Sequence, residues 1–207
     1  ASKGRYEERE FKLYLFGGRV EIEIAAGQAD DEGLEGLKAR HIKGVTLSAL
    51  KEVGSQLFYG ITNEADGFPG LKAFTPFGGA YTLNATGTTD NTASSVYGVK
   101  FGEDYASMLY GSTQDPFQLG EFSKESLTGN NGEKLPGEVA DLEGWLGLAI
   151  KHAASVVRIC NLTAQTGKGL TDALAGDAED LLPAGLKPDV YFMSKRSRTQ
   201  LRKSRRT

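Results

Sequence analysis

Residues 31–60 read DEGLEGLKARHIKGVTLSALKEVGSQLFYG, and this stretch decides the expected fold. Asp30 and Asp31 can cap the free N–H groups of a helix start, and Gly60 is typical of the left-handed residue that ends a helix. The sequence therefore predicts one helix from about Asp31 to Tyr59, roughly 40 Å long at 1.5 Å per residue. Its apolar residues recur at steps of mostly three to five, which suits one apolar face: Leu34, Leu37, Ile42, Val45, Ala49, Leu50, Val53 and Leu57.

The length of this helix points to an architectural role. Globular helices average about 11–12 residues, and a much longer one usually spans a molecule or lies along a partner. Gly33, Gly36, Gly44 and Gly54 lie inside the pattern. Each costs about 1 kcal/mol relative to alanine, so packing against a sheet must stabilise the helix. The glycines could also let another backbone approach closely, and an ordinary core helix is the alternative interpretation.

The segment before the helix alternates between apolar and polar residues. Residues 6–26 predict two strands, or one long strand broken by a turn at Gly17-Gly18. Nothing earlier in the chain supplies a partner strand, so we expect this segment to project from the body or pair with another chain. Under this hypothesis Ile22→Asp impairs assembly more than folding. Six apolar residues form the candidate subunit interface: Phe11, Leu13, Leu15, Val20, Ile22 and Ile24.

The rest of the chain mixes strands and helices. Strands are expected at 96–102 and 106–110, and two more over 145–162, where β-branched residues favour strands over a helix. A helix over 170–181 should end at Pro183. A buried strand over 189–193 then precedes a final helix that Ser194 can cap. The pattern predicts an α+β fold.

Charge is unevenly distributed along the chain. The 207 residues carry a net charge of −3, which excludes a general polyanion binder. Residues 195–207 hold seven of the 24 basic residues and none of the 27 acidic ones. This end is either a solvated helix face or a contact with nucleic acid or a neighbouring subunit. The candidate contact residues are Arg198, Arg202, Lys203, Arg205 and Arg206.

Signals for catalysis or metal binding are weak. The two histidines and the lone Cys160 are too few for a zinc site, and Cys160 lies in an apolar run typical of a buried thiol. Residues 166–169, TGKG, lack the glycine and the Ser/Thr that a phosphate loop needs. We therefore predict no catalytic residue, no metal and no cofactor. The sequence contains no run of 18 apolar residues, so no membrane span is expected.

The order of motifs along the chain resembles the major capsid proteins of tailed bacteriophages, which have the Hong Kong 97 capsid fold. The resemblance covers nearly the whole chain from about residue 5. It rests on a long strand, the long helix, and the loops and strands that follow in order. The motifs concerned are Leu57-Phe58-Tyr59-Gly60, Gly67-Phe68-Pro69-Gly70-Leu71, Ser95 to Gly102, Val157 to Leu162 and Val190 to Ser194 before the basic helix.

The resemblance implies an arrangement of domains. Residues 1–30 would form extended-loop strands, 31–100 a peripheral domain with the spine helix, and 101–207 an axial domain. A complete capsid subunit has an N-terminal arm and further C-terminal strands beyond these residues. The chain is therefore expected to be a fragment whose axial sheet is incomplete, with following strands needed to cover Leu201.

The resemblance also implies a function and partners. The expected role is a structural subunit that self-assembles as pentamers and hexamers into an icosahedral shell around bacteriophage dsDNA. Expected partners are other copies, scaffolding and portal proteins, and DNA without sequence specificity; no membrane is involved. The expected location is the virion capsid, and the host cytoplasm during assembly. The alternatives are an encapsulin-like nanocompartment shell, a nucleic-acid-binding module that uses the basic C-terminus, and an enzyme.

Overall fold

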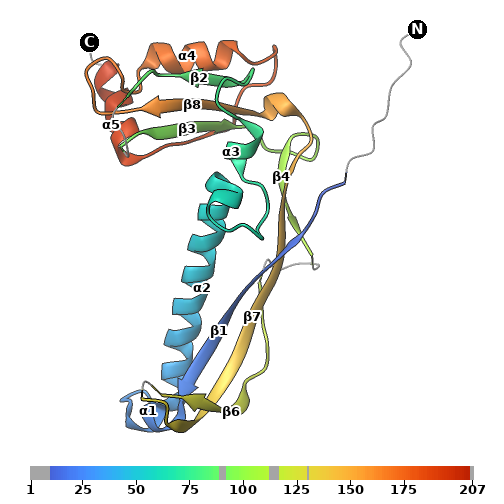
Figure 1. Cartoon of the computed structure of the whole chain (residues 1–207), viewed down its shortest axis with the longest axis vertical. Coiled ribbons are helices and arrows are strands. Elements are labelled where there is room, and N and C mark those ends of the chain that lie inside the picture. The colour runs from blue at the N-terminus through green and yellow to red at the C-terminus, as the bar shows by residue number, and fades with distance from the viewer. Residues whose placement is uncertain (1–9, 89–91, 112–116, 130, 206–207) are drawn as a thin grey trace. The chain divides into compact units, whose positions relative to one another are not determined.

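The computed structural model describes residues 10–88, 92–111, 117–129 and 131–205. These residues form two compact units (Figure 1). Unit 1 consists of Ala1–Leu57, Ile61–Phe68 and Leu109–Gly147, and unit 2 of Phe58–Gly60, Pro69–Met108 and Leu148–Thr207. The chain passes between the units several times, so their limits differ from the expected linear boundaries at residues 30 and 100.

A sheet built around one long strand forms the body of unit 1. The 17-residue strand β7 (Lys134–Ile150) pairs along one side with β1 (Tyr14–Glu23). It also pairs with three shorter strands, β4 (Ala106–Tyr110), β5 (Gln118–Leu119) and β6 (Ser123–Thr128). The expected strand at 106–110 is therefore confirmed. Strand β1 has one hydrogen-bonded neighbour among the described strands, which makes it an edge strand.

The partner of β1 corrects one expectation. Strand β1 is antiparallel to β7 over its whole length, from Tyr14 opposite Leu146 to Glu23 opposite Gly137. The prediction that this strand lacks a partner in its own chain is wrong, because the partner follows more than a hundred residues later. The register also runs unbroken through Gly17-Gly18, so there is one strand and no turn.

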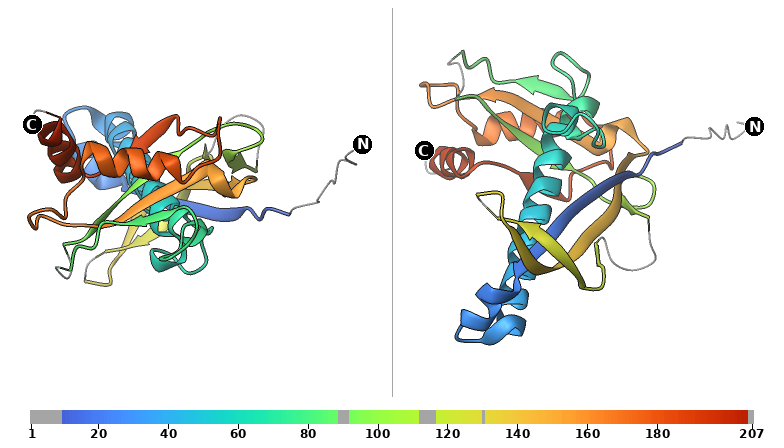
Figure 2. Two further views of the ribbon diagram at one scale, coloured as in Figure 1. Left: turned by 90° about the horizontal axis from the view of Figure 1, so that it is seen from above. Right: turned by 60° about the horizontal axis from the view of Figure 1, so that its bottom comes forward.

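Helix α2 (Gly33–Tyr59) confirms the long helix predicted from residues 31–59. The short helix α1 (Ile24–Ala29) precedes it and lies against its first turns, as Figures 1 and 2 show. An added Cβ at Gly27 would clash with Leu34, so the glycine permits this close approach. Glycine is also required at Gly60, whose φ of 56° is the left-handed conformation that ends the helix. A 3₁₀ turn (Gly60–Thr62) begins there.

Helix α2 packs on β1 and β7 within unit 1. An added Cβ at Gly18 would lie 3.1 Å from Val45, so the helix and the strand approach closely there. The fully buried residue of the helix is polar: the Gln56 amide donates to the Phe68 carbonyl oxygen at 2.7 Å. That bond secures the loop that ends at Phe68, whose ring is fully buried. The chain then enters unit 2, where the one-turn helix α3 (Leu71–Phe74) follows.

A largely buried ion pair connects α2 to β7. The Lys38 ammonium group lies 2.6 Å from Glu138 Oε2, and both side chains are only 14% exposed. The hydrogen bond to Glu138, and a second to Glu35, raise the pKa of Lys38. A lysine whose pKa is raised on folding stabilises the fold fully below its unfolded pKa, about 10.4, and loses this effect as pH rises through the folded value.

Lys38→Met is therefore expected to lower the free energy of unfolding by about 3 kcal/mol at neutral pH, because it leaves Glu138 unpaired in a partly buried place. The difference in unfolding free energy between the variant and the unmodified protein should become smaller above about pH 10.4. Urea denaturation between about pH 7 and pH 11.5 measures both effects. Lys43→Met, at an exposed position of the same helix, is the control. A difference that grows with alkaline pH would contradict the assignment.

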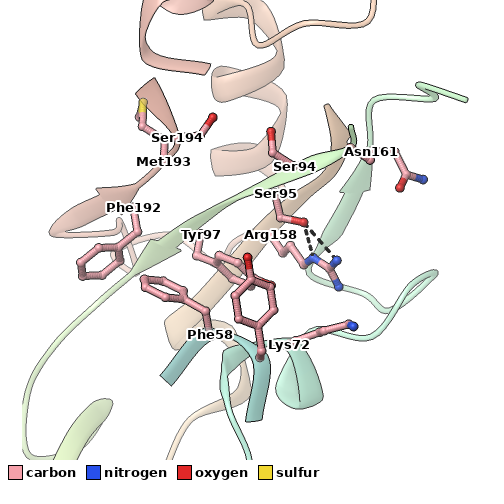
Figure 3. A pocket seen from close by; sticks show the side chains of 12 residues that line it. Phe58, Lys72, Ser94, Ser95, Tyr97, Arg158, Asn161, Phe192, Met193 and Ser194 are labelled. Atoms are coloured by element: carbon pink, nitrogen blue, oxygen red, sulfur yellow. Dashed lines mark hydrogen bonds between the residues drawn. The ribbon is translucent and has the colours of Figure 1, made fainter. Parts of the chain in front are cut away.

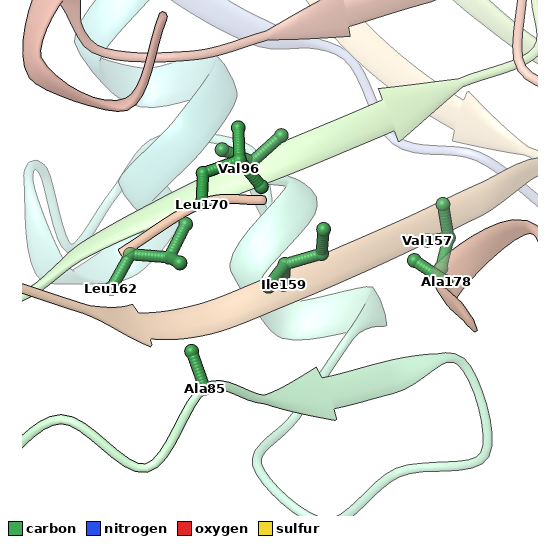
Figure 4. Packing of buried hydrophobic residues seen from close by; sticks show 7 residues of the cluster. All are labelled: Ala85, Val96, Val157, Ile159, Leu162, Leu170 and Ala178. Atoms are coloured by element: carbon green, nitrogen blue, oxygen red, sulfur yellow. The ribbon is translucent and has the colours of Figure 1, made fainter. Parts of the chain in front are cut away.

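Unit 2 is a four-stranded sheet covered by two helices. The strand order is β2 (Thr82–Asn84), β8 (Val156–Leu162), β3 (Ser94–Val99) and β9 (Val190–Phe192). A 3₁₀ turn at Ala153–Ser155 separates β7 from β8, so the prediction of two strands over 145–162 is confirmed. The core of the sheet consists of small and branched side chains (Figure 4): Ala85, Val96, Val157, Ile159, Leu162, Leu170 and Ala178.

Both helices of unit 2 begin at side-chain caps. The Thr171 hydroxyl accepts a hydrogen bond from the Leu174 N–H at the start of α4 (Asp172–Asp180). The Ser194 hydroxyl accepts from the Ser197 N–H at the start of α5 (Lys195–Ser204), as predicted. Leu201 of α5 packs against the core cluster of the unit. The expectation that strands beyond residue 207 must cover Leu201 is therefore wrong, because the sheet of this unit already covers it.

Candidate subunit interface

One face of the β1–β7 pair exposes large apolar side chains. Leu15 and Trp145 stand directly opposite each other in the register, and they are 55% and 50% exposed. Leu13 is 36% exposed, and its side chain lies over Gly147, where an added Cβ would be 3.1 Å from a leucine methyl group. Directly opposed side chains on antiparallel strands have Cβ atoms about 5 Å apart. Leu13, Leu15 and Trp145 therefore form one patch, here called the open-face patch.

The opposite face of β1 is core. Val20 and Ile22 are each 1% exposed, so neither side chain is available to another chain. Successive residues of a strand point to opposite faces, and the register passes straight through Gly17-Gly18. Odd-numbered Leu13 and Leu15 therefore point away from even-numbered Val20 and Ile22. The prediction that all six candidate residues belong to one subunit interface is therefore wrong for Val20 and Ile22, which lie in the core.

The two remaining candidates flank β1. Phe11 precedes the strand and Ile24 begins α1, and both are partly buried. Of the six predicted interface residues, only Leu13 and Leu15 thus lie in the open-face patch. Sequence reasoning missed Trp145, although alternation of exposed Asp141, Glu143 and Trp145 with buried Leu142 and Leu146 is a strand signal.

Charged side chains border the open-face patch. Arg19 lies on the same face of β1 and forms ion pairs with Glu125, with Glu21 at 3.4 Å and with Asp141 at 3.8 Å. These groups are about half exposed. Exposed ion pairs contribute little to stability, roughly 0–1 kcal/mol each. An apolar centre with a charged rim is the usual composition of a protein–protein interface.

The basic C-terminal residues divide into two groups. Arg198, Arg202 and Lys203 are exposed on α5, and none of them pairs with a carboxylate of the described residues. Arg205 is instead used within the unit, because its Nε donates to Asp172 Oδ1 at 2.8 Å. Arg206 lies outside the described residues. A polyanion contact thus has three of the five predicted residues available.

The described residues also bear on three other features: a metal site, a reactive thiol and a membrane-spanning helix. No group of three or more His, Cys, Asp or Glu side chains there could hold a metal ion. Burial raises the pKa of the Cys160 thiol, which favours the unreactive protonated form. Among the helices of the described ranges, none is long and apolar enough to cross a bilayer.

A comparison with known protein families identifies the family to which this chain belongs. The family model described as "Major capsid protein GP7" matches residues 37–205, which is most of the chain. The chain belongs to this family. The resemblance to bacteriophage major capsid proteins is thereby confirmed, and so is the structural role in a capsid that it implied. A search of curated proteins found no match.

The fold of this GP7-family protein has a solved counterpart. A chain in the near-atomic cryo-EM structure of bacteriophage epsilon15 matches with a TM-score of 0.67 at 15% identity. The match covers 93% of this chain and 62% of the epsilon15 chain. The GP7-family protein thus has the same α+β fold as a bacteriophage structural chain and spans under two thirds of its length.

Proposed function

We propose that this chain is the shell-forming part of a major capsid protein that self-assembles into an icosahedral shell around bacteriophage dsDNA. The observation that carries the proposal is the open-face patch on β1 and β7 of a capsid-family chain. Three large apolar side chains stay exposed beside a charged rim, and burial of one such side chain contributes about 1.5–3 kcal/mol. Repeated contacts between copies would bury them.

The two units fit the parts of a capsid subunit. Unit 1, with the 27-residue α2 as the spine helix, corresponds to the peripheral domain with its extended strand. Unit 2, with the sheet β2-β8-β3-β9 and two helices, corresponds to the axial domain, which would meet its copies around pentamer and hexamer axes. The shell would form in the host cytoplasm, with scaffolding and portal proteins as assembly partners.

Electron microscopy of the complete gene product, purified alone, tests the proposal. Closed shells or capsomer rings at micromolar concentration are the expected result. A single monomeric species up to millimolar concentration would contradict self-assembly. Nuclease-protected DNA in particles from infected cells supports the bacteriophage role. Particles that hold enzymes instead of DNA would favour the nanocompartment alternative.

A second proposal is that α5 contacts the packaged genome. Arg198 and Arg202 lie one turn apart on α5 and are free of carboxylate partners in the described part of the chain. Such a cationic helix face binds phosphates without reading sequence. The double change Arg198→Glu and Arg202→Glu should leave empty shells intact and reduce their retention of DNA.

The salt dependence of DNA binding by soluble subunits checks this result. The slope of log K against log salt should become shallower by about 0.9 for each phosphate that the variant no longer neutralises. Lys43→Glu together with Lys51→Glu, on the exposed surface of α2, is the matched control. Failed assembly with unchanged DNA affinity would instead assign the basic face to a contact between subunits.

A further inference from the structure

Unit 2 contains a cavity of about 560 Å³ that neither the open-face patch nor the basic face of α5 uses. Every described residue that lines it belongs to this unit. Its walls come from the last residues of α2, from α3 and from strands β3, β8 and β9 (Figure 3). Sites for small ligands usually have volumes of about 300–1,000 Å³. The cavity is therefore large enough for one small molecule.

One end of the cavity is aromatic. The ring centroid of Phe58 lies 5.7 Å from that of Tyr97 and 5.4 Å from that of Phe192, so these rings hold one another in place. Tyr59 also lines the cavity, but it is 57% exposed. An exposed aromatic ring beside a cavity can stack on a planar ligand. Such stacking suits any nucleobase, because every base has a π-face.

The other end of the cavity is cationic. Figure 3 shows Arg158, Lys72 and Asn161 at this end, on the side away from the aromatic cluster. Arg158 donates from Nε and Nη2 to the Ser95 hydroxyl at 3.1 and 3.0 Å, and from Nη1 to the Thr75 carbonyl oxygen at 3.1 Å. These neutral acceptors fix the direction of the guanidinium group but leave its charge uncompensated.

The positive charges at this end face no carboxylate across the cavity, because no Asp or Glu is among the described residues that line it. A guanidinium group has five N–H donors, and the three named bonds of Arg158 use three of them. The Tyr97 ring centroid lies 5.6 Å from the guanidinium carbon, but a ring face accepts none of the remaining bonds. Within the described structure, two donors of Arg158 and the exposed Lys72 ammonium group are thus available to an anionic ligand.

The number of charges favours a phosphate monoester over other anions. Such a group carries a charge of about −1.5 to −2 at pH 7 and three strong acceptor oxygens. A carboxylate or an internal phosphate of a nucleic acid strand carries a single charge. Arg158 and Lys72 supply two positive charges. The Asn161 amide has two N–H donors, of which one donates to Asn84 Oδ1 at 3.0 Å, so the other can donate to a phosphate oxygen.

We propose that this cavity binds a nucleoside 5′-monophosphate, with its base stacked on Tyr59 and its phosphate held by Arg158 and Lys72. The sugar would lie in the middle of the cavity, where Tyr97 lies between the two ends (Figure 3). This site goes beyond the capsid role and does not depend on self-assembly, because one unit of a single chain supplies it. The prediction of no cofactor rested on short motifs, which cannot show a site whose residues come from distant segments.

Isothermal titration calorimetry of the purified chain with deoxyadenosine 5′-monophosphate tests the assignment directly. Saturable binding with a Kd below about 1 mM is the expected result. Deoxyadenosine lacks the phosphate and inorganic phosphate lacks the base, so each should bind at least about tenfold more weakly than the nucleotide. Absence of saturable binding at this concentration would overturn the proposal, and so would equal affinity for either fragment.

Two variants at exposed positions test the two ends of the site without disturbing the core. Tyr59→Ala removes the stacking surface and should weaken nucleotide binding by roughly fivefold or more. Lys72→Gln removes one cation and should weaken it by about tenfold or more. The matched controls are Phe77→Ala, a 68% exposed aromatic residue of the same unit outside the cavity lining, and Lys43→Gln on α2. Equal effects of a variant and its control would contradict the site.

Thermal unfolding gives a second readout that needs no knowledge of assembly. A ligand that binds only the folded state stabilises it, so saturating nucleotide should raise the melting temperature of the unmodified chain by a few degrees. The same concentration should leave the melting temperature of Lys72→Gln nearly unchanged. A similar increase in both proteins would show that the nucleotide binds elsewhere.

A competition experiment separates the free nucleotide from a nucleic acid strand. A single-stranded oligodeoxynucleotide without terminal phosphates offers bases but only singly charged phosphates, so it should compete at least about tenfold more weakly per nucleotide. Tighter competition that depends on Tyr59 and Lys72 would overturn the assignment in favour of unpaired DNA. Failure of the complete gene product to form shells would refute the proposed function alone, since nucleotide binding is measured on the soluble chain.

Discussion

Aspartate at Leu15 or at Trp145 is expected to abolish shell assembly while the subunit stays folded. Both side chains are about half exposed on the open face of the β1–β7 pair, so the subunit loses little burial when they change. In a shell, each aspartate would have to be desolvated in an apolar contact, which costs several kcal/mol per unpaired charge. Because that contact recurs in every subunit, the destabilisation accumulates over the particle.

Sedimentation velocity and electron microscopy measure the assembly of these variants, and thermal unfolding measures the subunit. The melting temperature should change by only a few degrees, as expected for surface substitutions. Leu15→Met and Trp145→Phe keep the patch apolar and should still assemble. Normal shells from both aspartate variants would show that the open-face patch is not a subunit contact.

Ile22→Asp is expected to unfold unit 1, which reverses the prediction made from the sequence. Ile22 is 1% exposed and stands opposite Glu138 in the register, next to the Lys38–Glu138 ion pair. An unpaired charge there removes apolar burial and adds another carboxylate beside Glu138. A decrease of more than about 4 kcal/mol in the free energy of unfolding is expected for such a change.

Chemical denaturation and hydrogen exchange of the amides in β1 and β7 measure this decrease. Ile22→Val is the matched control and should cost only about 0.5–1.5 kcal/mol. A soluble Ile22→Asp subunit that has normal stability but fails to assemble would contradict the core position of Ile22 and support the original interface prediction. Together with Leu15→Asp, this variant distinguishes the two faces of one strand.

The local elements of the fold could be predicted because their signals are local. Helix α2 is encoded by apolar residues at helical spacing and by Gly60 at its end, and Ser194 caps α5 as expected. Strands β3, β4, β8 and β9 carry short β-branched or apolar runs bounded by turns. Motif order along the chain was enough for the capsid resemblance, because the order of elements is a property of the sequence alone.

The pairing of distant strands was not predictable from local pattern. Strand β7 is the partner of β1, yet more than a hundred residues separate Tyr14 from its partner Leu146. A sequence shows that a strand alternates, but not which strand lies beside it. The same limit applies to Arg205, which the basic run made a candidate contact with nucleic acid or a neighbouring subunit and which the fold pairs with Asp172.

By itself, the sequence determined the α+β class, the long helix and the capsid family of this protein, because periodicity, capping and motif order act along the chain. Only the tertiary structure decided which side of β1 is surface. The register through Gly17-Gly18 sets Leu13 and Leu15 on the open face beside Trp145, and Val20 and Ile22 in the core. Successive side chains of a strand point to opposite faces, so a shift of the register by one residue would exchange surface and core. Only the pairing with β7 fixes that register.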